Sequence, residues 1–201
     1  MLPQLPGSLA NSDVLVYIGA ELNTSEVDRW NAIVTSFSTN GRAARAEFGD
    51  SHPLQPGAML PMHLALTRGW LRQYDWVLRL NPDVLVHDGS HLESAFRSLK
   101  WWAVLAFCNT TAFTNCEVHT DAYAFRPSEL DEQSHASWNS TGRYESFACS
   151  SVFRRAIAES RVAWLTGNKL KYCRLSGAGG LVHHHRSLDS CPVPIQASSR
   201  R

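Results

Sequence analysis

The sequence predicts an α/β domain with a mostly parallel central sheet. Short, nearly continuous apolar runs alternate along the chain with segments whose apolar residues recur at helical spacing. An unbroken apolar run is typical of a strand buried on both faces, and alternation of such strands with helices indicates βαβ connections. With 201 residues, 44% of them hydrophobic, the chain is long enough for one such domain and too short for two comfortable ones.

The first predicted strand covers residues 13–19, an apolar run that ends in glycine. A helix is predicted from Thr24 to about Phe37, because Ser and acidic residues mark its start and apolar residues follow at helical spacing. Residues 40–57 are rich in Gly, Pro and polar groups, which predicts a loop. Helical spacing resumes over residues 59–74.

The next apolar stretch, residues 76–86, is interrupted at residues 81–83 by Asn-Pro-Asp. Because proline cannot donate to a strand ladder, the interruption predicts the end of a strand. A short helix over residues 90–99 and strands over 102–107 and 119–125 are expected to follow.

A long amphipathic helix is predicted over residues 144–164, and a Gly-rich turn then leads to Leu181 and three histidines. We expect the domain to span residues 13–188. Residues 1–12 are expected to be a disordered N-terminus, and residues 189–201 a C-terminal tail.

Composition excludes some classes of partner. The chain has 19 Lys and Arg against 18 Asp and Glu and no long basic run, so we do not expect it to bind nucleic acid. It shows no signal peptide and no apolar stretch long enough to span a membrane, so membrane contact is expected only through an N-terminal anchor that this sequence lacks.

The segment from Tyr74 to Val86 resembles the part of GT-A glycosyltransferases in which an apolar strand leads into a DxD motif. The order of elements over residues 13–185 is similar to theirs, which implies a GT-A-like (Rossmann-like) α/β/α sandwich. Asn81 and Asp83 take the outer positions of the motif, and the resemblance implies that these two residues and Arg79 bind the nucleotide-sugar donor.

The family's motif holds a divalent cation against the donor diphosphate, which implies that Asp83 is a ligand of Mn²⁺ or Mg²⁺. Asn81 departs from the pattern, because its amide supplies an oxygen without a charge. The alternative is that Asn-Pro-Asp forms only a strand-terminating turn, for which all three residues are suited.

The histidine tract supplies the next candidates. Many GT-A enzymes have a histidine ligand near the end of the domain, and on a strand His183 and His185 would share one face, so these two are the predicted metal ligands. Gly179 and Gly180 would let the backbone approach a phosphate closely. The alternative is a set of ordinary surface histidines.

Two acidic residues are candidate catalytic groups. Asp121 lies in a segment that resembles the strand after the metal motif, and Glu145 begins a helix where several GT-A families present an acid to the acceptor. An inverting transferase needs such a base. The alternatives are a structural carboxylate at Asp121 and a helix-dipole partner at Glu145.

The resemblance therefore implies transfer of a sugar from a nucleotide diphosphate donor to a hydroxyl of a glycan or glycoprotein acceptor. The alternative is a catalytically silent glycan-binding or scaffolding domain, which the neutral Asn81 favours. A zinc hydrolase is a third possibility, but the usual HxxxH-type spacing is absent.

The expected location is the Golgi or another secretory lumen. Asn-x-Ser/Thr sequons begin at Asn23, Asn109 and Asn139, and such sites are used only in that compartment, where disulfides also persist. The five cysteines contain no CxxC pair, so neither a zinc ribbon nor a thioredoxin-like motif is supported.

Overall fold

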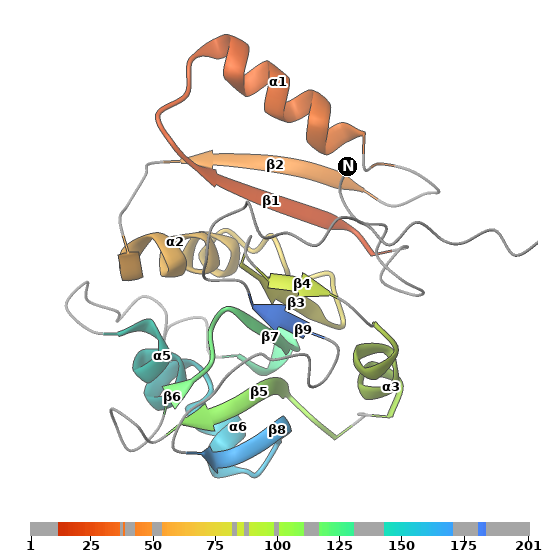
Figure 1. Cartoon of the computed structure of the whole chain (residues 1–201), viewed down its shortest axis with the longest axis vertical. Coiled ribbons are helices and arrows are strands. Elements are labelled where there is room, and N and C mark those ends of the chain that lie inside the picture. Colours follow the sequence, from red (N-terminus) through yellow and green to blue (C-terminus); the bar gives the residue numbers. More distant parts are fainter. Residues whose placement is uncertain are drawn as a thin grey trace, which may run out of the picture.

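The structure is a computed structural model, and its mixed α/β fold has helices on both faces of the largest sheet (Figure 1). Within the described part of the chain, no helix is both long and apolar enough to cross a membrane. The described residues are 12–36, 38, 43–49, 54–81, 84–86, 89–98, 101–110, 117–130, 143–170 and 181–183.

The N-terminal βαβ unit consists of β1 (Val14–Gly19), α1 (Thr24–Thr35) and β2 (Ala44–Gly49). The first strand and the helix confirm the prediction. The loop predicted over residues 40–57 is wrong in part, because β2 pairs with β1 in parallel along its whole length. The charged and apolar residues of β2 alternate over too few positions to predict a strand from the sequence. The hydrogen-bonded ladder to β1 stabilises β2 as a strand.

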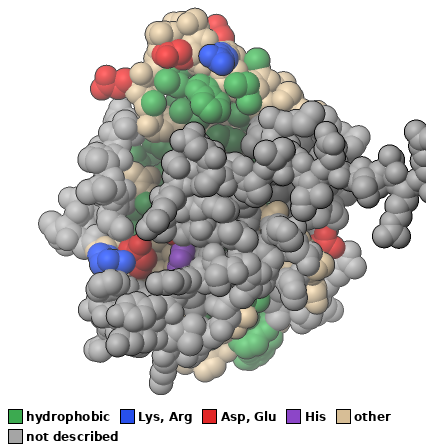
Figure 2. Space-filling view, viewed as in Figure 1, with side chains coloured by type: hydrophobic (Ala, Val, Ile, Leu, Met, Phe, Trp, Pro, Cys, Tyr) green, Lys and Arg blue, Asp and Glu red, His purple; other side chains and the backbone are tan. Residues whose placement is uncertain are grey.

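A capping box begins α1: the Asn23 side chain accepts a hydrogen bond from the Glu26 amide, and the Glu26 side chain accepts one from the Asn23 amide. Trp30 and Ile33 on this helix are 39% and 38% exposed. Figure 2 shows hydrophobic side chains gathered at the top of the molecule, over the region of α1.

The second helix, α2 (Leu54–Thr67), begins before the predicted residue 59 and ends well before residue 74. Gly69 stops it in the left-handed conformation, with φ of 69°. The Gly69 amide donates to the Leu66 carbonyl at 3.0 Å and the Trp70 amide to the Ala65 carbonyl at 2.9 Å, which is the Schellman arrangement of a helix end.

The largest sheet has the strand order β3-β7-β5-β6, with β8 paired to β5. Strands β3, β5 and β8 run in one direction, and β6 and β7 run in the opposite one. Three of its five strands therefore share one direction, as predicted, although only the β5–β8 ladder is parallel and the other three ladders are antiparallel. Its strands are β3 (Val77–Leu80), β5 (Val104–Thr110), β6 (Glu117–Val118), β7 (Ala122–Phe125) and β8 (Val162–Leu170).

Alternation along β7 divides the core into two clusters. Tyr123 and Phe125 pack in the cluster that includes α2 and the helical segment over residues 144–158. Ala122 and Ala124 pack in the opposite cluster, to which α3 (Ser90–Ser98) contributes Leu92. Both faces of this short strand are fully buried, which accounts for its unbroken apolar sequence.

The interruption at residues 81–83 is confirmed as a strand end, because β3 stops at Leu80 and β4 (Val84–Val86) belongs to another sheet. β4 pairs antiparallel with β9 (Leu181–His183). The described strands thus form three sheets, and the prediction of one central sheet is wrong in that respect.

The predicted long helix over residues 144–164 is also wrong. The segment divides into α5 (Tyr144–Phe147), a π-helical turn, η3 (Ala148–Val152), and α6 (Arg154–Ala158). Ser160, with φ of 56°, then ends the helix in the conformation usually taken by glycine, so the chain turns into β8 without the expected stop residue.

Two further local features are a turn after β7 and a disulfide-bonded cysteine in η3. A 3₁₀ turn, η2 (Pro127–Glu129), follows β7 at the proline that halts the strand. Cys149, in η3, is buried and disulfide-bonded.

Candidate functional site

Asn81 and Asp121 meet where β3 ends and β7 begins. These strands are antiparallel, and their register pairs Leu80 with Ala122, the neighbours of the two polar residues. The Asn81 amide donates to the Asp121 carbonyl at 2.8 Å, and the side-chain Nδ2 of Asn81 donates to Oδ1 of Asp121 at 2.6 Å. Two predicted site residues, 40 positions apart in sequence, are therefore joined by a backbone and a side-chain hydrogen bond.

This contact lies at the carboxyl end of β3. The parallel strand β5 ends on the same side, where Asn109 and Thr110 pair with β6, directly before the segment that leads to Asp121. In open α/β sheets, ligands bind beyond the carboxyl ends of the parallel strands. The contact is thus placed where such a fold binds its ligand.

His119 joins this cluster and was not among the predicted site residues. Its Nδ1 lies 3.6 Å from Oδ2 of Asp121, and the two side chains are 14% and 22% exposed. A carboxylate and an imidazole at this distance are close enough to face one group bound between them. His119 lies two residues before Asp121 in the sequence, and this closeness to a predicted site residue was the available sequence signal.

Arg79 is held by protein groups beneath the cluster. Its guanidinium donates to the carbonyl oxygens of Thr120 and Ala58 and lies 5.5 Å and 5.8 Å from the centres of the Tyr123 and Tyr144 rings. It thereby ties α2 to the residue that precedes Asp121. These contacts describe a positioning residue, and the direct contact with a donor stays a prediction.

Glu145 lies in the first turn of α5, which packs beside β6. Its Oε2 is buried and accepts no hydrogen bond from the described residues, although Nε of Arg143 lies 3.7 Å away. Its described charged partner is therefore Arg143, at ion-pair distance rather than hydrogen-bond distance.

Tyr144, which directly precedes Glu145, attaches α5 to the sheet. Its hydroxyl and that of Tyr123 form a buried hydrogen bond of 2.8 Å. Burial, as the largest cause, raises the pKa of both tyrosines, and Tyr123 is raised well above its usual value. Both hydroxyls are therefore neutral near pH 7, and their role is structural.

One predicted metal ligand, His183, lies on a described strand, β9, which pairs with β4. In the ladder of β4 and β9, Val84 is opposite His183, and Asp83 directly precedes Val84 in the chain. Opposed residues of an antiparallel pair have Cα atoms about 4.5–5.5 Å apart. Only the backbone of His183 is described, and Asp83, Gly179, Gly180 and His185 lie outside the described residues.

Among the described residues, no group of three or more His, Cys, Asp or Glu side chains could hold a metal ion. This statement does not cover the predicted ligands Asp83, His183 and His185, because their side chains are not described. Of the predicted donor atoms, the carboxylate and amide oxygens suit Mn²⁺ and Mg²⁺, whereas an imidazole nitrogen is more typical of Zn²⁺, Fe²⁺ or Ni²⁺.

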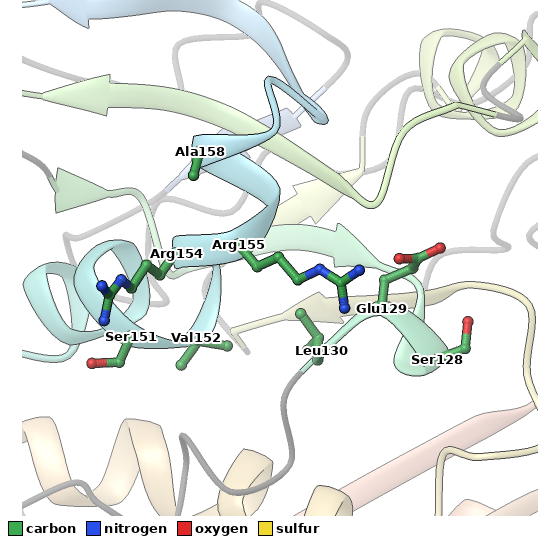
Figure 3. Close-up of a pocket in the computed structure, with 8 residues that line it drawn as sticks. All are labelled: Ser128, Glu129, Leu130, Ser151, Val152, Arg154, Arg155 and Ala158. Atoms are coloured by element: carbon green, nitrogen blue, oxygen red, sulfur yellow. The ribbon is translucent and has the colours of Figure 1, made fainter.

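A separate pocket of about 510 Å³ lies at the other end of β7. Figure 3 shows Arg155 of α6 reaching toward Glu129 of η2, while Arg154 points to the opposite side beside Ser151. Asp121 precedes β7 and η2 follows it, so the pocket and the candidate site occupy opposite ends of the sheet. None of the predicted site residues that the structure describes lines this pocket.

Comparison of the chain with protein-family models, curated proteins and solved structures found no match.

Proposed function

We propose that this domain transfers a sugar from a nucleotide diphosphate donor to a hydroxyl of a glycan or glycoprotein, with the help of Mn²⁺ or Mg²⁺. The observation that carries the proposal is the register of β4 and β9, in which Val84 opposes His183. This pairing sets Val84, the residue after Asp83 in the chain, opposite His183, the first residue of the histidine tract.

Asp83 and His183 or His185 would hold the cation, and Asn81 would assist through its amide oxygen. A bound cation would neutralise the charge that develops on the departing diphosphate. Gly179 and Gly180 would present backbone amides to the phosphates at close range.

The contact between Asn81 and Asp121 offers a reason for an amide at the first position of the motif. An aspartate at position 81 would set two carboxylates against each other at the 2.6 Å distance now bridged by the amide. Because Asn81 contacts Asp121 through Nδ2, this hydrogen bond does not use its Oδ1, the atom that could bind a cation.

Asp121 and Glu145 are the proposed groups for acceptor binding and base catalysis. Asp121 has His119 beside it, with Nδ1 3.6 Å from Oδ2, so both side chains could contact the same acceptor hydroxyl. Glu145 contributes a buried carboxylate oxygen that accepts no hydrogen bond from the described residues.

The competing proposal is a silent domain that binds glycans or organises partners, favoured by the loss of charge at Asn81. The two proposals differ in metal-dependent donor binding. Thermal unfolding with a panel of nucleotide diphosphate sugars, with and without Mn²⁺, measures that difference.

A donor at about a hundred times its Kd stabilises the folded state by about 2.7 kcal/mol. For a chain of this length, each kcal/mol raises the Tm by about 2–4 °C. We expect a rise that needs both Mn²⁺ and a donor. An unchanged Tm with every donor and Mn²⁺ would overturn the transferase proposal.

Substitutions at the site assign the roles. Asp83→Asn is expected to remove the metal-dependent shift, whereas Asp28→Asn, on the exposed face of α1, serves as the matched control and leaves it intact. Glu145→Gln is expected to keep donor binding and to lower kcat by about 10²–10⁴ if Glu145 is the base, measured as sugar transfer to a panel of acceptors. If Asp28→Asn lost the shift as fully as Asp83→Asn, the assignment of Asp83 would be wrong.

A further inference from the structure

We propose that Asn23 carries an N-linked glycan and that Asn109, in a second sequon, does not. The two asparagines share the Asn-x-Thr/Ser pattern but lie in opposite environments. Asn23 is exposed at the start of α1, whereas Asn109 is 7% exposed within β5. The proposal does not depend on sugar transfer by this domain.

The local geometry at Asn23 suits the modification. Its Oδ1 accepts hydrogen bonds from Oγ of Ser25 at 2.7 Å and from the Glu26 amide at 3.1 Å. N-linked glycans are attached through Nδ2, the other side-chain atom, so the helix cap and the glycan use different atoms. Thr24 and Ser25, the rest of the sequon, are exposed as well.

The reaction needs a lipid-linked oligosaccharide diphosphate, supplied with its transferase by the secretory pathway. The bond from the first sugar's C1 to the diphosphate oxygen breaks, and a bond from C1 to Nδ2 of Asn23 forms. The proton lost from Nδ2 passes to a base of that transferase, and the lipid diphosphate leaves with the bonding electrons.

Asn109 has no room for a glycan in the folded chain. It pairs with Val118 of β6, which is 0% exposed, and its own side chain is 7% exposed in a strand that contributes Val104, Leu105 and Ala106 to the core. A chain modified at Asn109 could not close this part of the sheet, so folded molecules are expected to lack a glycan there.

A second observation points to the compartment in which this modification occurs. Cys149 is disulfide-bonded, and disulfides persist in the secretory lumen and outside the cell but are rare in the cytosol. The disulfide and the exposed sequon therefore agree on one environment, from chemically unrelated features.

The test is expression of the whole chain in a eukaryotic host behind a heterologous signal sequence, with a C-terminal reporter sequon of known occupancy. Only molecules with a glycosylated reporter are scored, which selects chains that entered the lumen. Asn139, outside the described residues, is replaced by Gln in every sample. Peptide N-glycanase treatment and mass spectrometry then identify each modified asparagine.

We expect one glycan besides the reporter's, at Asn23, and its loss in Asn23→Asp and in Ser25→Ala. Asn23→Asp keeps an oxygen that can cap α1, so it separates loss of the glycan from loss of the fold. A reporter glycan alone, a second glycan that persists in Ser25→Ala, or a glycan found on Asn109 would each overturn the proposal. A glycosylated chain that ignores nucleotide sugars would contradict the proposed function and leave this inference standing.

Discussion

Gly69 and Ser160 occupy equivalent positions at the ends of two helices. After α2 the Gly69 and Trp70 amides return to Leu66 and Ala65, and after α6 the Ser160 and Arg161 amides return to Ile157 and Ala156 in the same pattern. Both residues have positive φ, 69° and 56°. Glycine adopts this conformation without strain, whereas a residue with a Cβ atom is destabilised by about 1–2 kcal/mol.

The two positions give opposite predictions for substitution. Gly69→Ala is expected to lower the free energy of unfolding by about 1 kcal/mol, and Ser160→Gly to raise it by about 1 kcal/mol, measured by urea denaturation. Gly57→Ala, within α2, is the matched control for the first change and is expected to be neutral or stabilising. If Ser160→Gly lowered the free energy of unfolding, the Ser160 hydroxyl would stabilise the fold by more than the positive φ destabilises it.

At the scale of elements, the contact between α5 and β7 depends on two hydroxyl groups. Tyr123 and Tyr144 are 1% and 0% exposed and share a hydrogen bond of 2.8 Å. Phe153 packs edge-on against Tyr123, with ring centres 5.2 Å apart. The apolar contacts provide most of the stabilisation, while the hydroxyl pair fixes how the helix is oriented on the sheet.

A double-mutant cycle measures that pair. Tyr123→Phe and Tyr144→Phe are each expected to cost about 1–3 kcal/mol, because each leaves the other hydroxyl buried without this partner. The double variant is expected to cost clearly less than the sum. Tyr74→Phe, which removes an exposed hydrogen bond to Asp13, is the control with a smaller effect. Additive costs would mean that the two hydroxyls do not stabilise each other.

The same pair predicts a response to alkaline pH. Since burial raises both tyrosine pKa values above the ordinary 10.0, the folded state holds these protons more tightly than the unfolded state. Their contribution is complete below pH 10.0 and is lost as pH rises above it. The double phenylalanine variant should therefore lose less stability than the native chain between about pH 9 and about pH 11.

At the scale of the whole molecule, the ion pair of Arg161 and Glu129 connects three elements at the end of the sheet opposite the candidate site. Arg161, just before β8, donates to both carboxylate oxygens of Glu129 at 2.7 Å and 2.9 Å and to the Trp101 carbonyl at 3.0 Å. It thus joins η2, β8 and the entry to β5, which are far apart in sequence. The hydrogen bonds from Arg161 are the main cause that lowers the pKa of Glu129.

This pair predicts a loss of stability in acid. A carboxylate whose pKa is lower when folded contributes stability that is complete above its ordinary pKa of 4.5 and is lost as pH falls below it. Glu129→Gln is expected to lower the free energy of unfolding by about 1 kcal/mol near neutral pH, with little difference from the native chain near about pH 3.

Glu159→Gln is the control, because that exposed carboxylate hydrogen-bonds Arg155 at the surface and lies 3.6 Å from Arg161 outside its two short bonds to Glu129, so its loss should change stability little. A Glu129→Gln deficit that stayed constant from neutral to acid pH would show that the charge of Glu129 is not the cause. Donor binding should be unaffected by either change, since both lie away from the candidate site.

The sequence by itself determined the features that depend on neighbouring residues. These are the first strand, the capped start of α1, the end of β3 at residues 81–83 and the buried strand that became β7. Each has a local cause, such as a capping side chain, a proline or an apolar run. Asn81 and Asp121 could be named as site candidates for the same reason, because residue type and position after a strand are visible locally.

The tertiary structure alone decided which of these segments meet. β2 and β8 gain their stability from ladders to β1 and β5, and no residue within them signals that partner. The contact of Asn81 with Asp121 and the opposition of Val84 and His183 follow from strand register, which is a property of two distant segments together. Local propensity carries no information on register, and for this reason the site residues were predictable singly and their arrangement was not.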